Sequence, residues 1–172
     1  ASGKLQKMVD EDGVTGGTSN PSIFEKAIAS GAAYDDHMRE LIARDASIPG
    51  IFDALTVADI QRSADVFRRV CDQSKGADGY ASLEVPPGLA YDAQGTIENA
   101  RRLFRALDRP NVMIKIPGTQ EGLPAVETCL SEGINGNITL LCSAENYEQV
   151  ALAYIAALEK RAERGERIDN IA

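Results

Sequence analysis

The chain has 172 residues, of which 44% are apolar, a formal net charge of −8 and a pI near 4.7. This size and apolar content suit one domain with its own hydrophobic core, and no window is apolar for long enough to span a bilayer. Binding to nucleic acid or to an acidic membrane needs a basic surface, so the acidic charge argues against both partners. A small anionic ligand needs only a local Arg or Lys cluster and stays compatible with the composition.

The first residues, ASGKLQKMVDEDG, have neither the apolar core nor the flanks of a signal peptide, so we expect a cytoplasmic protein. They read instead as the tail of a helix. Three cysteines, Cys71, Cys129 and Cys142, lie far apart in no metal-type spacing and are expected to be free thiols. The single histidine, His37, lies in a polar stretch and is expected to be a solvated helix residue.

One pattern then recurs along the chain: a short apolar-rich run, a turn and a segment of helical period. The four runs are GVTGGTSN at 13–20, GYASLEV at 79–85, NVMIKIP at 111–117 and NGNITLLCS at 135–143. Strands that alternate with helices at this pitch pair in parallel through right-handed crossovers. The pattern therefore predicts the α/β class.

Each predicted helix begins at a residue that can cap or start it. These residues are Asn20 with Pro21, Thr56, Thr96 and Ser143. A loop at 47–50 precedes the second helix, which is expected to end near Gly76, and Pro110 stops the third.

Within each predicted strand, alternate residues fall on opposite faces of the sheet. One face carries the polar residues Thr18, Asn20, Tyr80, Ser82, Glu84, Lys115, Asn135, Asn137 and Thr139, together with Met113. The other carries Leu83, Val85, Val112, Ile114, Ile116, Ile138, Leu140 and Cys142. A doubly wound sheet has helices on both faces, so a barrel with a polar interior opening at the strand ends fits better. In the alternative interpretation, each polar residue is a separate strand-end or capping group.

A closed (β/α)₈ barrel needs about 250 residues, whereas this sequence supplies four strand–helix units. It begins in a helix and stops, at ERIDNIA, where a further strand would be entered. We therefore expect residues 1–172 to be part of a longer barrel domain, with a first strand and the last strands outside this sequence.

Lys115 lies in the middle of an apolar strand, where an unpaired ammonium would cost several kcal/mol. A lysine in such a place is destabilised in its charged form, and its neutral amine can attack a ketone to form a Schiff base. Glu84, on the same face of the preceding strand, can move the protons, and Asn20, Asn137 and Thr139 can orient hydroxyl groups or a water. A structural Lys–Glu ion pair would give the same pattern, so the residues alone lead only to a carbonyl-directed lysine enzyme.

The segments GVTGGTSNPSIF, ADGYASLEVPPGLAYD and NVMIKIPGTQEGLPAVETCLSEGINGNITLLCS resemble the transaldolase family, in its longer bacterial class, some members of which are fused to glucose-6-phosphate isomerase. The resemblance implies strands 2 to 5 of a (β/α)₈ barrel and their helices. It also implies a pentose phosphate pathway transferase that forms a Schiff base with fructose 6-phosphate or sedoheptulose 7-phosphate and passes a dihydroxyacetone unit to an aldose phosphate. No cofactor and no metal are implied.

By the same resemblance, the Schiff-base lysine is Lys115, the glutamate that moves protons through a bound water is Glu84, and the threonine that holds this water is Thr139. The dihydroxyacetone moiety is expected on Asn20 and Asn137, with Thr18 beside the first.

The family's acid/base aspartate and phosphate-binding serine and arginines would lie outside residues 1–172, so we expect little turnover from these residues alone. Two alternatives remain at this stage: a fructose-6-phosphate aldolase of the same superfamily, and a non-catalytic half-barrel that binds sugars or a partner. The sequence also leaves open whether copies of the chain associate.

Overall fold

A computed structural model of the chain describes residues 3–30 and 32–172. In chain order its elements are α1 (Lys4–Glu11), β1 (Gly17–Thr18), α2 (Pro21–Ser30), the 3₁₀ turn η1 (Ala32–Tyr34), α3 (Asp35–Ala43), α4 (Ile48–Gln73), β2 (Ala81–Glu84), the 3₁₀ turn η2 (Pro87–Leu89), α5 (Ala93–Leu107), β3 (Val112–Pro117), α6 (Leu123–Ser131), β4 (Gly136–Thr139) and α7 (Ala144–Glu163).

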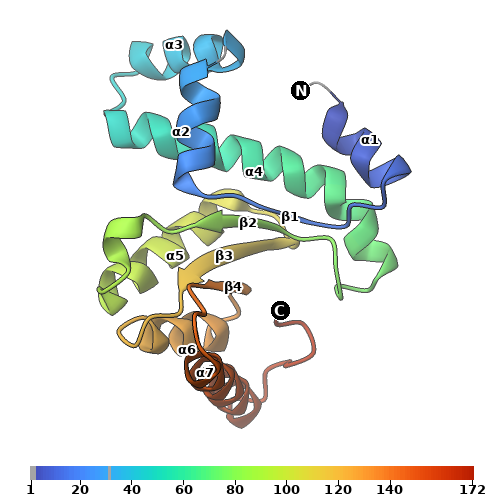
Figure 1. The fold of residues 1–172 in the computed structure, drawn as a ribbon, viewed down its shortest axis with the longest axis vertical. Helices are drawn as coiled ribbons and strands as arrows, with labels where there is room; N and C mark the ends of the chain where they lie inside the picture. The colour runs from blue at the N-terminus through green and yellow to red at the C-terminus, as the bar shows by residue number, and fades with distance from the viewer. Residues whose placement is uncertain (1–2, 31) are drawn as a thin grey trace.

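The four strands form one parallel sheet in the order β1-β2-β3-β4, and the helices that connect them wrap around its outer face (Figure 1). This curled arrangement is half of a (β/α)₈ barrel, which confirms the predicted fold class. At one edge of the sheet α1 lies beside α4. At the other edge the chain returns to β4, where the backbone amide of Gly136 donates to the carbonyl of Ala172 at 2.8 Å.

The core lies between the outer face of the sheet and the helices α4, α5 and α6. The outward-pointing strand residues Leu83, Val85, Val112, Ile114 and Ile116 are all buried. Phe67 of α4 packs so closely on β1 that a Cβ at Gly17 would lie 3.2 Å from its ring. Burial of this apolar face supplies the main driving force for the half-barrel, since each large side chain contributes about 1.5–3 kcal/mol.

Two predicted helix starts are correct and two are wrong. Ser143 accepts a hydrogen bond from the backbone amide of Asn146 and caps α7, and Asn20 does the same for α2. However, α4 begins at Ile48 rather than at Thr56, because Ser47 provides the cap and a proline in the first turn suits a helix start. Likewise α5 begins before Thr96, because Asp92 accepts from the amide of Gly95.

The predicted fourth strand, at 135–143, is longer than the strand in the structure. The strand β4 ends at Thr139, and Leu140 follows it in a left-handed conformation with φ 63°. This turn breaks the alternation, so Leu140 and Cys142 are exposed instead of buried under helices. The chain leaves the sheet here to reach Ser143 and α7.

The three cysteines are free thiols, as predicted. Burial raises the pKa of the Cys129 thiol to about 12.

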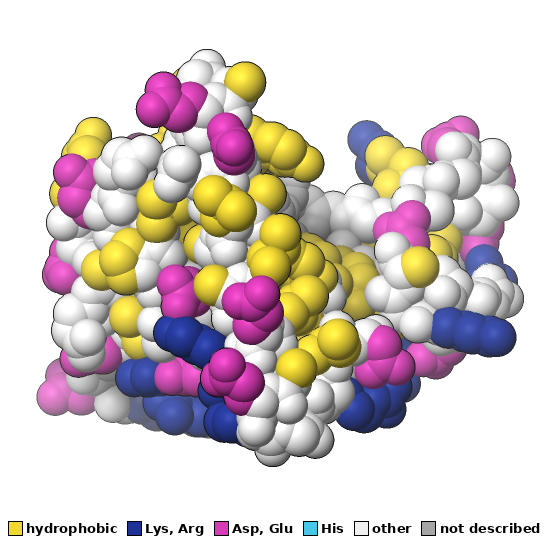
Figure 2. Space-filling view, turned by 90° about the horizontal axis from the view of Figure 1, so that it is seen from below, with side chains coloured by type: hydrophobic (Ala, Val, Ile, Leu, Met, Phe, Trp, Pro, Cys, Tyr) yellow, Lys and Arg dark blue, Asp and Glu magenta, His cyan; other side chains and the backbone are white. Residues whose placement is uncertain are grey.

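Among the described residues, no helix is both long and apolar enough to cross a membrane. Figure 2 shows many hydrophobic side chains on the face seen from below, the side on which α7 lies in Figure 1. In α7, Tyr147, Leu152 and Ile155 are exposed.

The Gly79 position tests how tightly α4 is joined to β2. Gly79 has φ +90°, and a Cβ there would lie 2.3 Å from the backbone nitrogen of Cys71. Gly79→Ala should therefore lower the free energy of unfolding by more than about 3 kcal/mol, through a clash added to the left-handed strain. The matched control is Gly13→Ala, with φ +71° and nothing within 4 Å, which should cost only about 1 kcal/mol. Urea unfolding of both variants measures the difference, and equal losses would contradict this packing.

Candidate active site

The centre of the candidate site is an ion pair between two neighbouring strands. The register of β2 and β3 places Glu84 directly opposite Lys115, and both side chains point to the inner face. The Nζ atom of Lys115 lies 3.4 Å from Oε2 of Glu84, and the two side chains are only 15% and 18% exposed. The lysine inside the apolar strand is therefore paired, which offsets the cost of holding its charge away from water.

Asn137 lies on the other side of the lysine. The register of β3 and β4 pairs Lys115 with Asn137, so Glu84, Lys115 and Asn137 form one row across three strands. The Asn137 amide donates from Nδ2 to Oγ of Ser82 at 3.0 Å. Thr139 follows two residues later on the same face, opposite Pro117 and toward the carboxyl end of the sheet.

Asn20 lies just beyond β1, at the point where α2 begins. Its Oδ1 accepts a hydrogen bond from the backbone amide of Ile23 at 2.9 Å, so the side chain caps the helix. This contact uses the oxygen and leaves the Nδ2 group, which can donate two hydrogen bonds, for other partners. The cap also fixes the direction in which the amide points.

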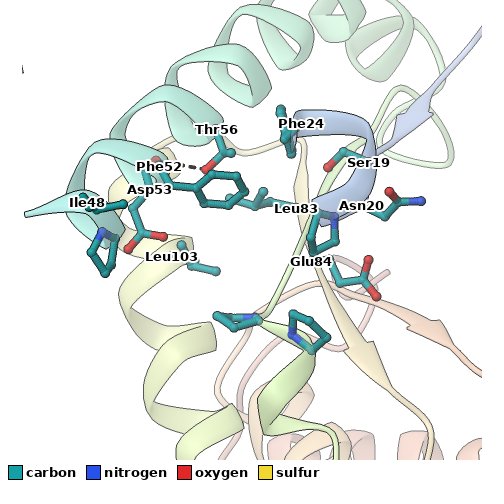
Figure 3. A pocket seen from close by; sticks show the side chains of 14 residues that line it. Ser19, Asn20, Phe24, Ile48, Phe52, Asp53, Thr56, Leu83, Glu84 and Leu103 are labelled. Carbon is teal, nitrogen blue, oxygen red and sulfur yellow. Dashed lines mark hydrogen bonds between the residues drawn. The ribbon is translucent and has the colours of Figure 1, made fainter. Parts of the chain in front are cut away.

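Asn20 and Glu84 line one end of a cavity of about 350 Å³ (Figure 3). Its walls are mainly apolar and come from α2, α4, α5 and the turn after β2. The main wall residues are Phe24, Ile48, Phe52, Leu83, Pro86 and Leu103. In Figure 3 the amide of Asn20 and the carboxylate of Glu84 point away from these apolar walls, and Lys115 is not among the residues that line the cavity.

Thr18 lies at the end of β1, two residues before Asn20. It is exposed and pairs in register with Ser82, and it lines a second cavity of about 660 Å³ between α1, α2 and α4. In that cavity Tyr34 donates to Oδ2 of Asp59 at 2.6 Å, and burial together with this bond raises the pKa of Tyr34 to about 12. Of the six predicted site residues, the structure groups Glu84, Lys115 and Asn137 most closely.

Sequence reasoning gave no role to two features of this region. The first is the hydrogen bond between Ser82 of β2 and Asn137 of β4. Ser82 was assigned to the inner face, but this bond joins two strands that are separated by β3. The apolar cavity wall combines Phe24 and Phe52, whose rings pack edge to face with centroids 6.3 Å apart. The parity of β2 was a usable signal for Ser82, whereas no local pattern indicated the cavity.

The curled parallel sheet, with Glu84 at the end of β2 and Lys115 opposite it on β3, fits the class of barrel proteins that build their sites on the inner face and the strand ends. Comparison with known sequences identifies the group within this class. A profile of the family described as Transaldolase/Fructose-6-phosphate aldolase matches residues 2–167. The chain belongs to this family.

Curated relatives named transaldolase match the chain over nearly all of its length. Transaldolase from Trichodesmium erythraeum is 51% identical over 99% of this chain and 45% of the relative. Transaldolase 2 from Nostoc punctiforme is 49% identical over 99% of this chain and 45% of the relative. Transaldolase from Saccharopolyspora erythraea is 46% identical over 99% of this chain and 46% of the relative. The chain thus spans about half the length of these relatives.

Replacement of Asn20 tests how much its cap of α2 contributes to the free energy of unfolding. Asn20→Ala removes the cap of α2 and should lower the free energy of unfolding by about 1 kcal/mol. Asn20→Ser keeps a capping oxygen, because serine is equally preferred at this position, and should restore most of that stability. Urea unfolding of both variants checks the expectation. Equal stability of the Ala and Ser variants would show that the cap contributes nothing.

Proposed function

We propose that this chain carries the Schiff-base part of a transaldolase site. The reaction is the transfer of a dihydroxyacetone unit from fructose 6-phosphate or sedoheptulose 7-phosphate to an aldose phosphate. The observation that supports it most strongly is the 3.4 Å contact between Lys115 and Glu84, both of them largely shielded from water. The family and the names of the relatives agree with this chemistry.

In the proposed reaction, Glu84 takes a proton from the Lys115 ammonium that it contacts, and the neutral amine then attacks the keto carbon of the donor. Loss of water gives an iminium ion. The iminium accepts the electron pair of the neighbouring carbon–carbon bond as that bond breaks, which releases an aldose phosphate and leaves an enamine. Addition of the enamine to a second aldose phosphate and hydrolysis of the new Schiff base return the free lysine. Each step moves a proton.

Glu84 is the proposed group for these proton transfers, because its carboxylate lies beside the amine at which water is lost and regained. Thr139 is proposed to hold the water that carries the protons. Asn20 and Asn137 are proposed to bind the hydroxyl groups of the dihydroxyacetone unit, with Thr18 in support near Asn20. With the nucleophile Lys115, the row of Glu84, Lys115 and Asn137 is thus fully assigned to the proposed reaction.

The proposal extends to the whole protein. Residues 1–172 would be part of a longer (β/α)₈ domain, since they form four of eight strands and span about half of each relative. The acid/base aspartate and the phosphate-binding residues would come from the remaining strands. Sugar phosphates would be the substrates, and the protein would act in the cytoplasmic pentose phosphate pathway.

A fructose-6-phosphate aldolase is the second candidate, because the family that matches the chain includes both activities. The two share the lysine chemistry and differ in the fate of the enamine, which in the aldolase is protonated to an iminium that water then hydrolyses to release the dihydroxyacetone. Product analysis with fructose 6-phosphate separates them. Transaldolase forms a new ketose phosphate only when an aldose phosphate acceptor is present, whereas the aldolase releases free dihydroxyacetone without one.

Covalent trapping tests the nucleophile. Borohydride added with fructose 6-phosphate should fix a reduced adduct on Lys115 of the complete polypeptide, detectable by intact mass and peptide mapping. Lys115→Ala should remove the adduct and the turnover, and Lys115→Arg, which keeps a cation beside Glu84, should remove both as well. The matched control is Lys160→Ala, which breaks an ion pair with Glu127 on the outer helices and should leave trapping unchanged. Turnover retained by Lys115→Ala would refute the mechanism.

Proton transfer is tested at the glutamate. Glu84→Gln keeps the size of the side chain but removes its basic group, so kcat should fall about 10²–10⁴-fold while KM for the ketose changes far less. Steady-state kinetics with fructose 6-phosphate measure both constants. Glu127→Gln, at the other half of the outer ion pair, serves as the control. A rise in KM with kcat unchanged would assign Glu84 to binding instead of proton transfer.

A further inference from the structure

A partly buried hydrogen bond crosses the inner face of the half-barrel from β2 to β4. Ser82 is only 3% exposed, and its Oγ accepts from Nδ2 of Asn137 at 3.0 Å. In the sheet register, Ser82 lies opposite Met113 and Asn137 lies opposite Lys115. The bond therefore crosses the intervening strand β3, between the register positions of Met113 and Lys115.

Ser82 is itself held in place from the other side. Its backbone carbonyl accepts from the amide of Ser19 at 3.3 Å and from the Ser19 hydroxyl at 2.9 Å. Ser19 is buried just after β1, so Ser82 is anchored between two strands before it contacts Asn137. These bonds hold the backbone of Ser82, from which its short side chain reaches Asn137.

We propose that Ser82 is a positioning residue for the keto-sugar, acting through the amide of Asn137. The terminal torsion of an asparagine is broad and roughly two-fold, so a free amide has no single orientation. The bond to Ser82 uses one of the two hydrogens of Nδ2 and sets the direction of Oδ1, which can accept from a hydroxyl group beside the keto carbon bound at Lys115. This inference rests on the proposed function, because it needs a ketose attached to the lysine.

A positioning role of Ser82 should change KM for the ketose without changing kcat, which a purely structural role would not do. If the serine acts only by orienting Asn137, its removal should weaken binding of the ketose more than it slows the chemistry. Ser82→Ala should raise KM for fructose 6-phosphate about three- to tenfold, the range expected for one hydrogen bond, with less than about a twofold change in kcat. KM for the aldose phosphate acceptor should stay the same.

A double-mutant cycle tests whether Ser82 acts on ketose binding through Asn137. Ser82→Ala, Asn137→Ala and the double variant are made in the complete polypeptide, and kcat/KM for fructose 6-phosphate is measured for each. In the Asn137→Ala background, the additional Ser82→Ala change should alter kcat/KM by less than about twofold. Ser131→Ala is the control, because Ser131 is also buried but donates only to the carbonyl of Thr128 within α6.

Each outcome decides the proposal. An unchanged KM in Ser82→Ala, or an equal loss of kcat/KM with and without Asn137, overturns the positioning role while borohydride trapping at Lys115 still supports the proposed function. If the parent protein is not trapped at Lys115 by fructose 6-phosphate, the proposed function fails and the positioning role fails with it. The positioning role is supported if Ser82→Ala raises KM in the parent protein but has almost no additional effect in the Asn137→Ala background.

Discussion

The register between β2 and β3 is the constraint on which the site depends. It places Glu84 opposite Lys115 and so gives a shielded ammonium its partner. A shift by one residue would turn every inner side chain of β2 to the core and leave Lys115 unpaired, at a cost of several kcal/mol. The same shift would expose Leu83 and Val85, which are buried under the helices. Packing on the outer face therefore fixes the chemistry available on the inner face.

The two faces of the sheet have separate tasks. The outer face is closed by α4, α5 and α6 and supplies stability through apolar burial. The inner face carries the polar row and gains little from burial, so its side chains are held by hydrogen bonds and an ion pair instead. This division is common to barrels that build their sites at the carboxyl ends of strands.

Several side chains at the site serve the fold as well as the proposed chemistry. Asn20 caps α2 with its oxygen and leaves its amide nitrogen for other partners. Ser82 receives bonds from β1 and β4 through different atoms, its carbonyl and its hydroxyl. Such contacts restrict the side-chain rotations of groups that must meet a substrate in one geometry. Rigidity of the site is in this way a by-product of how the strands are joined.

The sequence alone determined the α/β class, the four strand regions and the face on which Lys115 and Glu84 lie, because residue alternation is a local property of each strand. It was less successful where helix starts depend on competing caps, as at Ser47 and Asp92, and where Leu140 ends β4 early. Only the tertiary structure decided the row of Glu84, Lys115 and Asn137, the bond of Asn137 to Ser82 and the apolar cavity beside them. These features depend on register and curvature between segments far apart in the chain, which no local pattern encodes.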